Sequence, residues 1–337
     1  MTTTPVTRRV TAADIARSVG VSRATVGYVL NDTPGQTIST ATRERVLETA
    51  RALGYRPHAA AQALASGRSR LVLLVLPDWP QDYSVRRSIE EAALVLDEAG
   101  YTLVTWTPHA TGRTRPLWQL LDPDVVFGFV PFPTADVQAM RAHGIRAIVP
   151  DPDETATSPD AAEQAGTHGP VLQVRHLYDL GHRRIALAST SDPRLGDLAR
   201  LRGEVAQRTA SAQGMECLAA VAVDAPGVDL SAQVRDWIAD GVTGVVAYND
   251  DIAAMVAGAA ISTGVVVPDL LSIVGHDDSP LAALFLPALS SIRLDGTGLG
   301  RLIADQVLAK IEGRPPLTDA GAALETVVAR GSTRRVI

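Results

Sequence analysis

Residues 11–30 read TAADIARSVGVSRATVGYVL, and this stretch decides the fold of the N-terminal part of the chain. Thr11 can cap a first helix, and Asp14 three positions later completes a capping-box-like pair. Gly20 is where that helix should end, because glycine accepts positive φ, and Ser22 can cap a second helix. Two short helices around a glycine turn predict a helix-turn-helix, a motif whose second helix lies in the major groove of DNA.

Charge is distributed unevenly along the chain. The net charge is −6, yet residues 1–70 contain ten arginines and four acidic residues and therefore carry +6, which leaves −12 for residues 71–337. A basic head on an acidic body is typical of a protein whose head contacts phosphate and whose body does not.

The segment after the helix-turn-helix supplies a third helix and a linker. Residues 39–53 place Val46, Leu47 and Ala50 on one face, and residues 58–66 predict a short alanine-rich helix. The segments Asp-Ile-Ala, Gly-Val-Ser, Thr-Val, Val-Leu-Asn, Thr-Arg, Gly-Tyr-Arg-Pro and Ala-Leu-Ala-Ser-Gly-Arg-Ser occur in this order. They resemble the DNA-binding head and hinge of the lactose-repressor (LacI/GalR) family.

The resemblance implies roles for individual residues of the head. In that family the hinge helix enters the minor groove and a leucine wedges open the central base step; Leu64 occupies the matching position. Many members have Ser-Arg where this sequence has Gly27-Tyr28, and tyrosine cannot form the bidentate bond of arginine to guanine. The expected DNA contacts are Ser22, Thr25 and Asn31 to phosphate, Arg23, Ala24 and Tyr28 to bases, Leu64 to the minor groove, and Thr11 in addition.

From residue 71 onward, apolar strand-like runs alternate with helical patterns. The alternation predicts parallel sheets with right-handed crossovers, and the number of strands predicts two sheets with a cleft between them. The strand-like runs are residues 71–76, 102–106, 125–130, 147–149, 185–188, 217–223, 244–248 and 271–274, and helix-like stretches between them include 85–99, 170–180, 198–212, 230–239 and 252–263.

Further segments extend the resemblance over nearly the whole chain. They are residues 177–186 (LYDLGHRRIA), 200–203 (RLRG), 274–278 (VGHDD), 287–292 (PALSSI) and 325–333 (ETVVARGST). The resemblance implies an all-α helix-turn-helix head followed by an α/β body like a periplasmic binding protein. The expected domains are a head at 1–57, a hinge at 58–70, and an effector-binding and dimerisation domain at 71–337, with an N-subdomain of about 71–167 and 293–321 and a C-subdomain of about 168–292 and 322–337.

Polar and aromatic residues near the predicted strand ends are candidates for binding a small molecule, because ligands of open α/β sheets sit beyond the carboxyl ends of the strands. A guanidinium, an amide and a carboxylate together offer the donors and acceptors that suit sugar hydroxyls. Two aromatic residues after the first strand could stack on a sugar face or simply pack. The candidates are Trp79, Tyr83, Asp151, Arg200, Asn249 and Asp277.

Catalysis and metal binding find little support. Residues 296–300 (GTGLG) have the wrong spacing for a dinucleotide fingerprint. His176 and His182 are six residues apart and so do not share a helix face, and Cys217 falls in an apolar strand. We therefore expect no enzyme activity, no cofactor and no metal site.

Residues 1–10 lack the apolar region of a signal peptide, and no run approaches the ~20 apolar residues of a membrane helix, so we expect a cytoplasmic protein with no membrane contact. The expected function is transcription regulation, as a repressor whose affinity for double-stranded operator DNA is controlled by a small polar effector such as a sugar. Tetramers of the family that the sequence resembles use an extra C-terminal leucine-heptad tail. No such tail follows Arg330, so we expect a homodimer. The alternatives are a transport-type solute-binding protein and a DNA-bending architectural protein with a vestigial sensor.

Overall fold

The computed structural model describes residues 10–31, 35–55, 68–109, 112, 114–151, 153, 168–317 and 324–336. The chain divides into two compact units, Met1–Arg70 and Leu71–Ile337. The helix expected at residues 58–66, with Leu64, lies outside the described residues.

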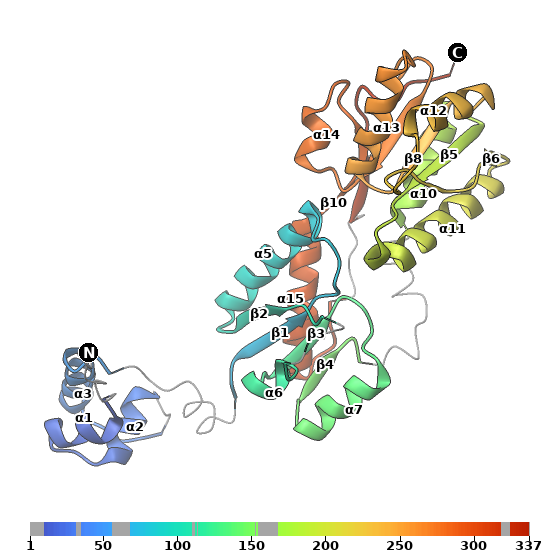
Figure 1. Cartoon of the computed structure of the whole chain (residues 1–337). Coiled ribbons are helices and arrows are strands. Elements are labelled where there is room, and N and C mark those ends of the chain that lie inside the picture. Colours follow the sequence, from blue (N-terminus) through green and yellow to red (C-terminus); the bar gives the residue numbers. More distant parts are fainter. Residues whose placement is uncertain are drawn as a thin grey trace, which may run out of the picture. The chain divides into compact units, whose positions relative to one another are not determined.

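The first unit contains three helices around a small apolar core. Ile15, Val26, Val29 and Val46 are buried there, one or two from each helix. Isolated helices of this length are marginal in water, so this shared core stabilises them. The helices are α1 (Ala12–Val19), α2 (Arg23–Leu30) and α3 (Thr40–Ala52), which confirms the three predicted from the sequence (Figure 1).

The second unit begins with a parallel four-stranded sheet in the order β2-β1-β3-β4. Its middle strands are apolar on both sides because helices cover both faces. One face packs against α5 and α15 and the other against α6 and α7. The elements are β1 (Leu71–Val75), α5 (Tyr83–Glu98), β2 (Thr102–Trp106), α6 (Trp118–Leu121), β3 (Val125–Gly128), α7 (Thr134–His143), β4 (Ala147–Val149) and α15 (Gly296–Glu312).

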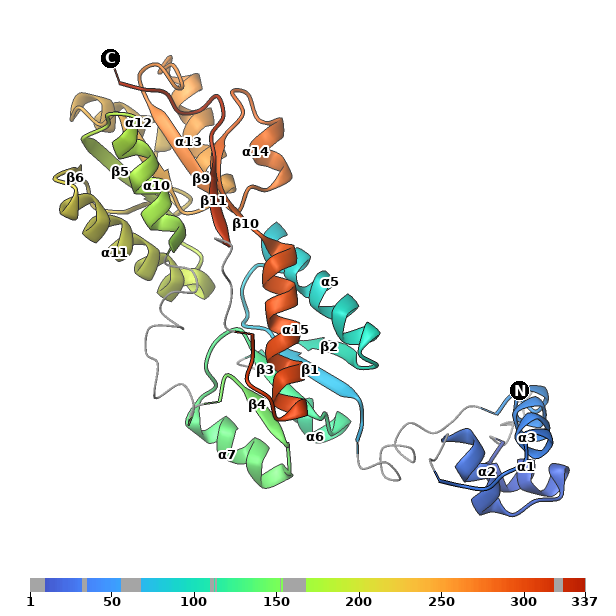
Figure 2. The same ribbon diagram turned by 180° about the vertical axis from the view of Figure 1, so that it is seen from behind.

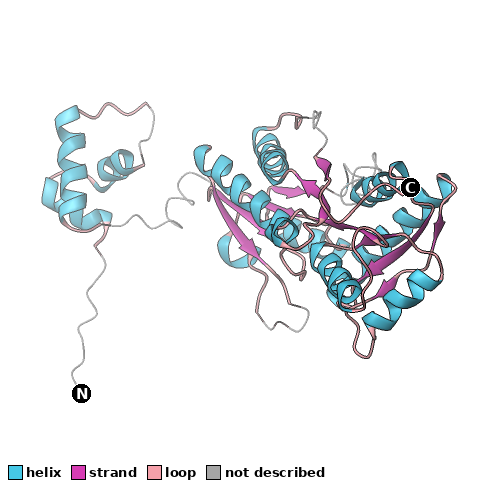
Figure 3. Cartoon of the chain, turned by 90° about the horizontal axis from the view of Figure 1, so that it is seen from above, coloured by secondary structure: helices cyan, strands magenta, loops and turns pink. Residues whose placement is uncertain are grey.

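A seven-stranded sheet follows in the order β11-β10-β9-β8-β5-β6, with β7 also pairing with β5. All of its pairs are parallel except that of β10 with β11, and helices again flank the sheet (Figure 2, Figure 3). Its elements are α10 (His168–Asp179), β5 (Arg184–Ser189), η1 (Pro193–Leu195), α11 (Gly196–Ala212), β6 (Glu216–Cys217), β7 (Val221–Ala222), α12 (Leu230–Ala239), β8 (Gly244–Ala247), α13 (Asp250–Ser262), β9 (Ser272–His276), α14 (Pro280–Leu284), β10 (Ser290–Leu294) and β11 (Glu325–Val328).

One predicted strand is wrong in detail. The run at residues 217–223 forms two short strands rather than one, because β6 pairs with the beginning of β5 and β7 with its end. The two mainly parallel sheets and the other predicted strands are confirmed, but β10 (Ser290–Leu294) was not among the strand-like runs predicted from the sequence.

The chain leaves the seven-stranded sheet through β10, forms α15 against the four-stranded sheet, and returns as β11. The glycines of residues 296–300 allow α15 to approach α5 closely. A Cβ on Gly300 would lie 2.5 Å from the carbonyl oxygen of Ser88, and one on Gly296 would lie 2.8 Å from Cβ of Arg87. This glycine motif therefore serves helix packing.

Candidate nucleic-acid and small-molecule sites

Local hydrogen bonds fix the first helix of the head. The Asp14 carboxylate accepts from the backbone N–H of Thr11 at 2.9 Å and from its hydroxyl at 2.7 Å. Gly20 then ends α1 in the left-handed region at φ 76°. The predicted cap and the predicted stop are both confirmed, and they place the start of the second helix.

The second helix of the head has one buried face and one exposed face. Ser22 caps it, since its hydroxyl oxygen accepts from the backbone N–H of Thr25 at 3.0 Å. Val26 and Val29 are buried, whereas Arg23, Ala24 and Tyr28 are exposed. The residues expected to face bases thus share the solvent side of a rigid helix, in its first two turns.

The remaining residues of this expected surface lie at its edges. Thr25 is half-buried and its hydroxyl lies 2.8 Å from that of Ser22. Asn31 is the C-terminal cap of α2. Arg45 of α3 donates to the carbonyl of Val19 at 2.7 Å, which ties α3 to the end of α1.

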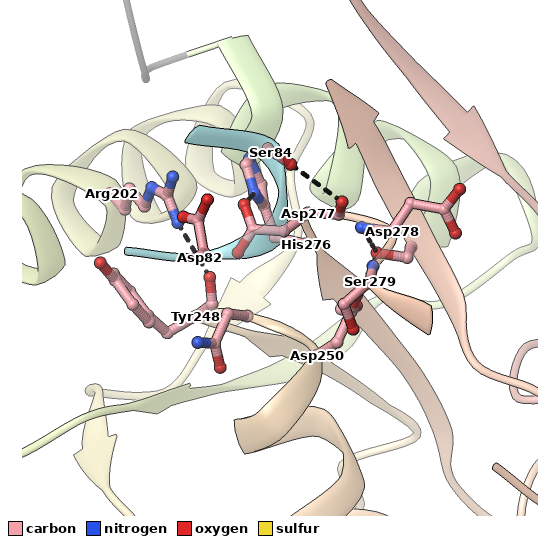
Figure 4. A network of polar contacts seen from close by, with 12 residues as sticks. Asp82, Ser84, Arg202, Tyr248, Asp250, His276, Asp277, Asp278 and Ser279 are labelled. Carbon is pink, nitrogen blue, oxygen red and sulfur yellow. Dashed lines mark hydrogen bonds and ion pairs between the residues drawn. The ribbon is translucent and has the colours of Figure 1, made fainter. Parts of the chain in front are cut away.

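A polar cluster lies between the two sheets of the second unit (Figure 4). We define it by its six residues, which come from helices, loops and the end of β9, far apart in the sequence: Asp82, Ser84, Arg202, Tyr248, His276 and Asp277. The Ser84 hydroxyl donates to the backbone carbonyl of Asp277 at 3.0 Å and so joins α5, which packs on the four-stranded sheet, to the turn after β9.

Arg202 provides the positive charge of the polar cluster. Its Nη1 donates to the backbone carbonyl of Tyr248 at 3.0 Å, and its guanidinium lies 4.9 Å from the centre of the Tyr248 ring. Its Nε is buried and has no hydrogen-bond partner within the described residues. Because an unsatisfied buried donor is costly, this N–H would gain a hydrogen bond from any acceptor atom that reached it.

Two carboxylates lie near this guanidinium: that of Asp82, at the start of α5, and that of Asp277, directly after β9. Burial raises the pKa of Asp82, and the negative charge of Asp277 raises it further. Burial acts to raise the pKa of Asp277 as well, but His276 and Arg202 outweigh it and lower that pKa. His276 Nδ1 lies 2.7 Å from the Asp277 carboxylate. The cluster therefore stabilises the negative charge of Asp277 and disfavours that of Asp82.

A small cavity of about 30 Å³ adjoins the polar cluster, enough for a water molecule or two. Gln173, Ser189, Arg202 and Tyr248 line it together with apolar residues of β5, β8 and α11. Small-molecule pockets are usually about 300–1,000 Å³, so this cavity is by itself too small for a sugar.

The predicted arginine of this site lies elsewhere. Arg200 is 62 % exposed on α11, where it pairs with Glu204 at 2.9 Å and with Asp197 at 3.7 Å. Residues two apart on a helix point to nearly opposite sides, so when Arg202 points toward the polar cluster, Arg200 points away from it. The structure therefore places Arg202 in the polar cluster and Arg200 on the surface, and a role of Arg200 in binding an effector stays a prediction.

The other predicted effector residues fall into two groups. Asp277 belongs to the polar cluster, and Asn249, which directly follows Tyr248, caps α13 by accepting from the N–H of Ile252 at 2.9 Å. Asp151 lies at the end of β4 and forms ion pairs with Lys310 at 3.1 Å and Arg141 at 3.3 Å. Burial acts to raise the pKa of Asp151, but the hydrogen bond from the backbone N–H of Asp153, together with Lys310 and Arg141, lowers it.

Trp79 and Tyr83 flank Asp82 in the sequence; Trp79 is half-buried and Tyr83 is exposed at the start of α5. Five residues of the polar cluster were not among the candidates predicted from the sequence: Asp82, Ser84, Arg202, Tyr248 and His276. Asp82 carried a local signal, since it caps α5 by accepting from the N–H of Val85 at 2.8 Å.

Neither a metal cluster nor a membrane helix was found in the part of the chain that the structure describes. No group of three or more histidine, cysteine, aspartate or glutamate side chains there is arranged to hold a metal ion. No described helix is long and apolar enough to cross a bilayer.

Comparisons with known proteins match both units of the chain. Residues 11–58 match the family described as "Bacterial regulatory proteins, lacI family", and residues 174–333 match a periplasmic binding protein-like domain. The HTH-type transcriptional regulator MalR of Streptomyces coelicolor is 31 % identical, over 95 % of this chain and 96 % of that protein. The ribose operon repressor of Bacillus subtilis is 27 % identical, over 96 % and 99 %.

Solved structures share the fold. A lac repressor dimer bound to operator and the anti-inducer ONPF is similar with a TM-score of 0.73 and 23 % identity, covering 97 % of this chain and 100 % of that one. The transcriptional regulator CelR in complex with cellobiose is similar with a TM-score of 0.57 and 22 % identity, covering 96 % and 100 %.

Proposed function

Because this chain belongs to the lacI family of bacterial regulatory proteins and is a DNA-binding transcriptional regulator, we propose that it is a cytoplasmic repressor whose operator affinity is set by an uncharged, hydroxyl-rich effector. We propose a head at residues 1–57, a hinge at 58–70 that includes Leu64, and an effector-binding body at 71–337. The output is a change in DNA affinity and needs no catalysis.

The observation that carries this proposal is the exposed face of α2. Arg23, Ala24 and Tyr28 lie on the solvent side of a helix that is capped by Ser22 and packed on α1 and α3. The N-terminal residues of such a helix contact base edges, and the excess of arginine in the head supplies the charge that phosphates attract.

Selection from a random duplex pool by the full chain tests DNA binding. We expect one enriched, pseudo-palindromic sequence, because a symmetric dimer binds two symmetric half-sites. Its affinity should fall steeply with salt as counterions are released. Enrichment of no sequence, or of a single asymmetric half-site bound by a stable monomer, would contradict the proposal.

The charge of the polar cluster supports the effector class. Burial and the charge of Asp277 already disfavour the negative charge of Asp82, and the negative charge of Asp192 also acts on Tyr248. A negative charge on the ligand would be disfavoured as well, whereas hydroxyl groups can donate to the carboxylates and accept from Arg202 Nε. The site therefore favours neutral sugars over phosphosugars.

Matched pairs of ligands test this choice. The melting temperature of the full chain is measured with glucose, galactose, ribose, maltose and cellobiose, and with glucose 6-phosphate and ribose 5-phosphate as charged counterparts. We expect at least one neutral sugar to raise the melting temperature. Stabilisation by a phosphosugar and by no neutral sugar would contradict the proposal.

Exposed leucines on the second unit support a homodimer. Leu284 is 79 % exposed and Leu286 is 83 % exposed, at the end of α14 and just beyond it. Adjacent exposed apolar residues mark interaction surfaces more often than single ones do. Leu284→Asp should shift the chain from dimer to monomer in sedimentation, and an unchanged dimer would place the interface elsewhere.

A further inference from the structure

Two consecutive aspartates follow β9 in an unusual backbone conformation. Asp277 has φ 91° and Asp278 has φ 45°, in the left-handed region that residues other than glycine rarely adopt. Three consecutive N–H groups hold the turn. Asp277 donates to the carbonyl of Ile292 at 2.8 Å, Asp278 to the hydroxyl of Ser291 at 3.0 Å, and Ser279 to the carboxylate of Asp250 at 2.7 Å.

The two aspartate side chains have different partners. The Asp277 carboxylate belongs to the polar cluster and contacts His276 (Figure 4). The Asp278 carboxylate is 7 % exposed and accepts from Arg293 Nε at 2.6 Å and from Arg330 Nη2 at 2.5 Å. Adjacent residues of one rigid turn therefore serve two separate sets of contacts.

The two arginines lie at opposite ends of the β10–β11 pair. Arg293 is the next-to-last residue of β10, from which the chain passes to α15, whereas Arg330 lies two residues after β11, at the end of that strand away from the connection. Arg330 is itself fixed, since its Nη1 donates to the carbonyl of Leu289 at 2.8 Å and its backbone N–H donates to Ser290 Oγ at 2.8 Å. One buried carboxylate thus holds the start of the outgoing connection and the segment that follows β11.

We propose that Asp278 is a positioning residue that links the turn carrying Asp277 to the outgoing connection between the sheets, at Arg293, and to the segment after β11, at Arg330. A ligand that moves Asp277 must then move Arg293 and Arg330, and a change imposed on the outgoing connection must move Asp277. This inference rests on the proposed function, because the purpose of the link is to join the effector site to DNA binding. Such coupling is reciprocal, so DNA must affect the turn as the effector affects DNA.

Hydrogen exchange with DNA as the probe tests the link without a known effector. The full chain is compared free and bound to the duplex that it selects from a random pool. In wild type we expect bound DNA to change exchange of the amides of residues 276–279 by about fivefold or more, the lower end of usual allosteric couplings. In Asp278→Asn, whose asparagine accepts the left-handed region, we expect less than about a twofold change.

Two further variants make the test decisive. Asp269→Asn is the control, because it removes an exposed carboxylate that pairs with Arg334. In this variant, bound DNA should change the exchange of residues 276–279 as it does in wild type. Arg293→Gln removes the 56 % exposed partner of Asp278 and should reduce the response; it decides the question alone if Asp278→Asn does not fold.

DNA affinity should stay within about threefold of wild type in all three variants, because none of the changed residues lies in the head. An undiminished response of residues 276–279 in the Asp278 and Arg293 variants, or no response in wild type, would overturn the link. Failure to select any DNA would instead overturn the proposed function.

Discussion

Replacement of Arg202 by methionine tests the polar cluster most sharply. Methionine keeps an apolar stem beside the Tyr248 ring but removes every donor of the guanidinium. The buried Nε of Arg202 has no partner within the described residues, so its hydrogen bond to a ligand oxygen would be gained in full on binding. Hydrogen bonds to charged groups contribute ~1.5–3 kcal/mol, which corresponds to an effector affinity about 10- to 150-fold weaker.

The matched control is Arg200→Met, two residues earlier on the same helix. Arg200 makes only exposed ion pairs with Glu204 and Asp197, so its loss should leave effector affinity within about twofold of wild type. The assay is calorimetric titration with the neutral sugar that most raises the melting temperature, after circular dichroism has established that each variant folds. Equal weakening by both variants, or wild-type affinity in Arg202→Met, would refute the assignment of Arg202.

Three further predictions concern other parts of the molecule. Tyr28→Arg should change base preference at one symmetric pair of operator positions, with ~1–3 kcal/mol of discrimination for a bidentate contact to guanine; identical selected sequences would mean that Tyr28 does not face bases. Burial raises the pKa of Asp250 from its ordinary value of 3.8 to about 6. Between these two pH values the folded state keeps a proton that the unfolded state has released, so the free energy of unfolding falls as the pH rises from about 4 to 6. In urea titrations the unfolding free energy of wild type relative to Asp250→Asn should therefore drop by about 3 kcal/mol across that range, and a pH-independent difference would contradict the burial of that charge. A Cβ on Gly169 would lie 2.1 Å from His276 Nε2, so Gly169→Ala should destabilise by about 1–3 kcal/mol, whereas Gly203→Ala, with open space around its Cβ, should stabilise slightly; equal effects would contradict the packing.

The head could be predicted well because its signals are local. Ser22 and Ser39 each accept from an N–H three residues later, and Gly20 ends a helix at the position that the sequence indicates. Such caps depend on neighbours within one helical turn, which a sequence displays directly. The alternation of strands and helices in the body is equally visible from apolar periodicity.

The polar cluster could be predicted only in part because tertiary contacts define it. Ser84 and Asp277 are 193 residues apart in the sequence, and no local pattern indicates that the hydroxyl of one meets the carbonyl of the other. The choice between Arg200 and Arg202 depends on which side of α11 packs against β5, and the Arg-Leu-Arg run alone does not show this. Asp151 follows a strand as expected, but its neighbours from α7 and α15 are cations that satisfy it.

The central claim is that a small molecule bound in the body changes the DNA affinity of the head. The most direct measurement is the dissociation constant of the full chain for its selected duplex, titrated with the neutral sugar that stabilises it most and, in parallel, with a sugar that does not. The account predicts a change of about fivefold or more, in either direction, with the stabilising sugar alone. A dissociation constant that stays constant while the sugar saturates the body would contradict it.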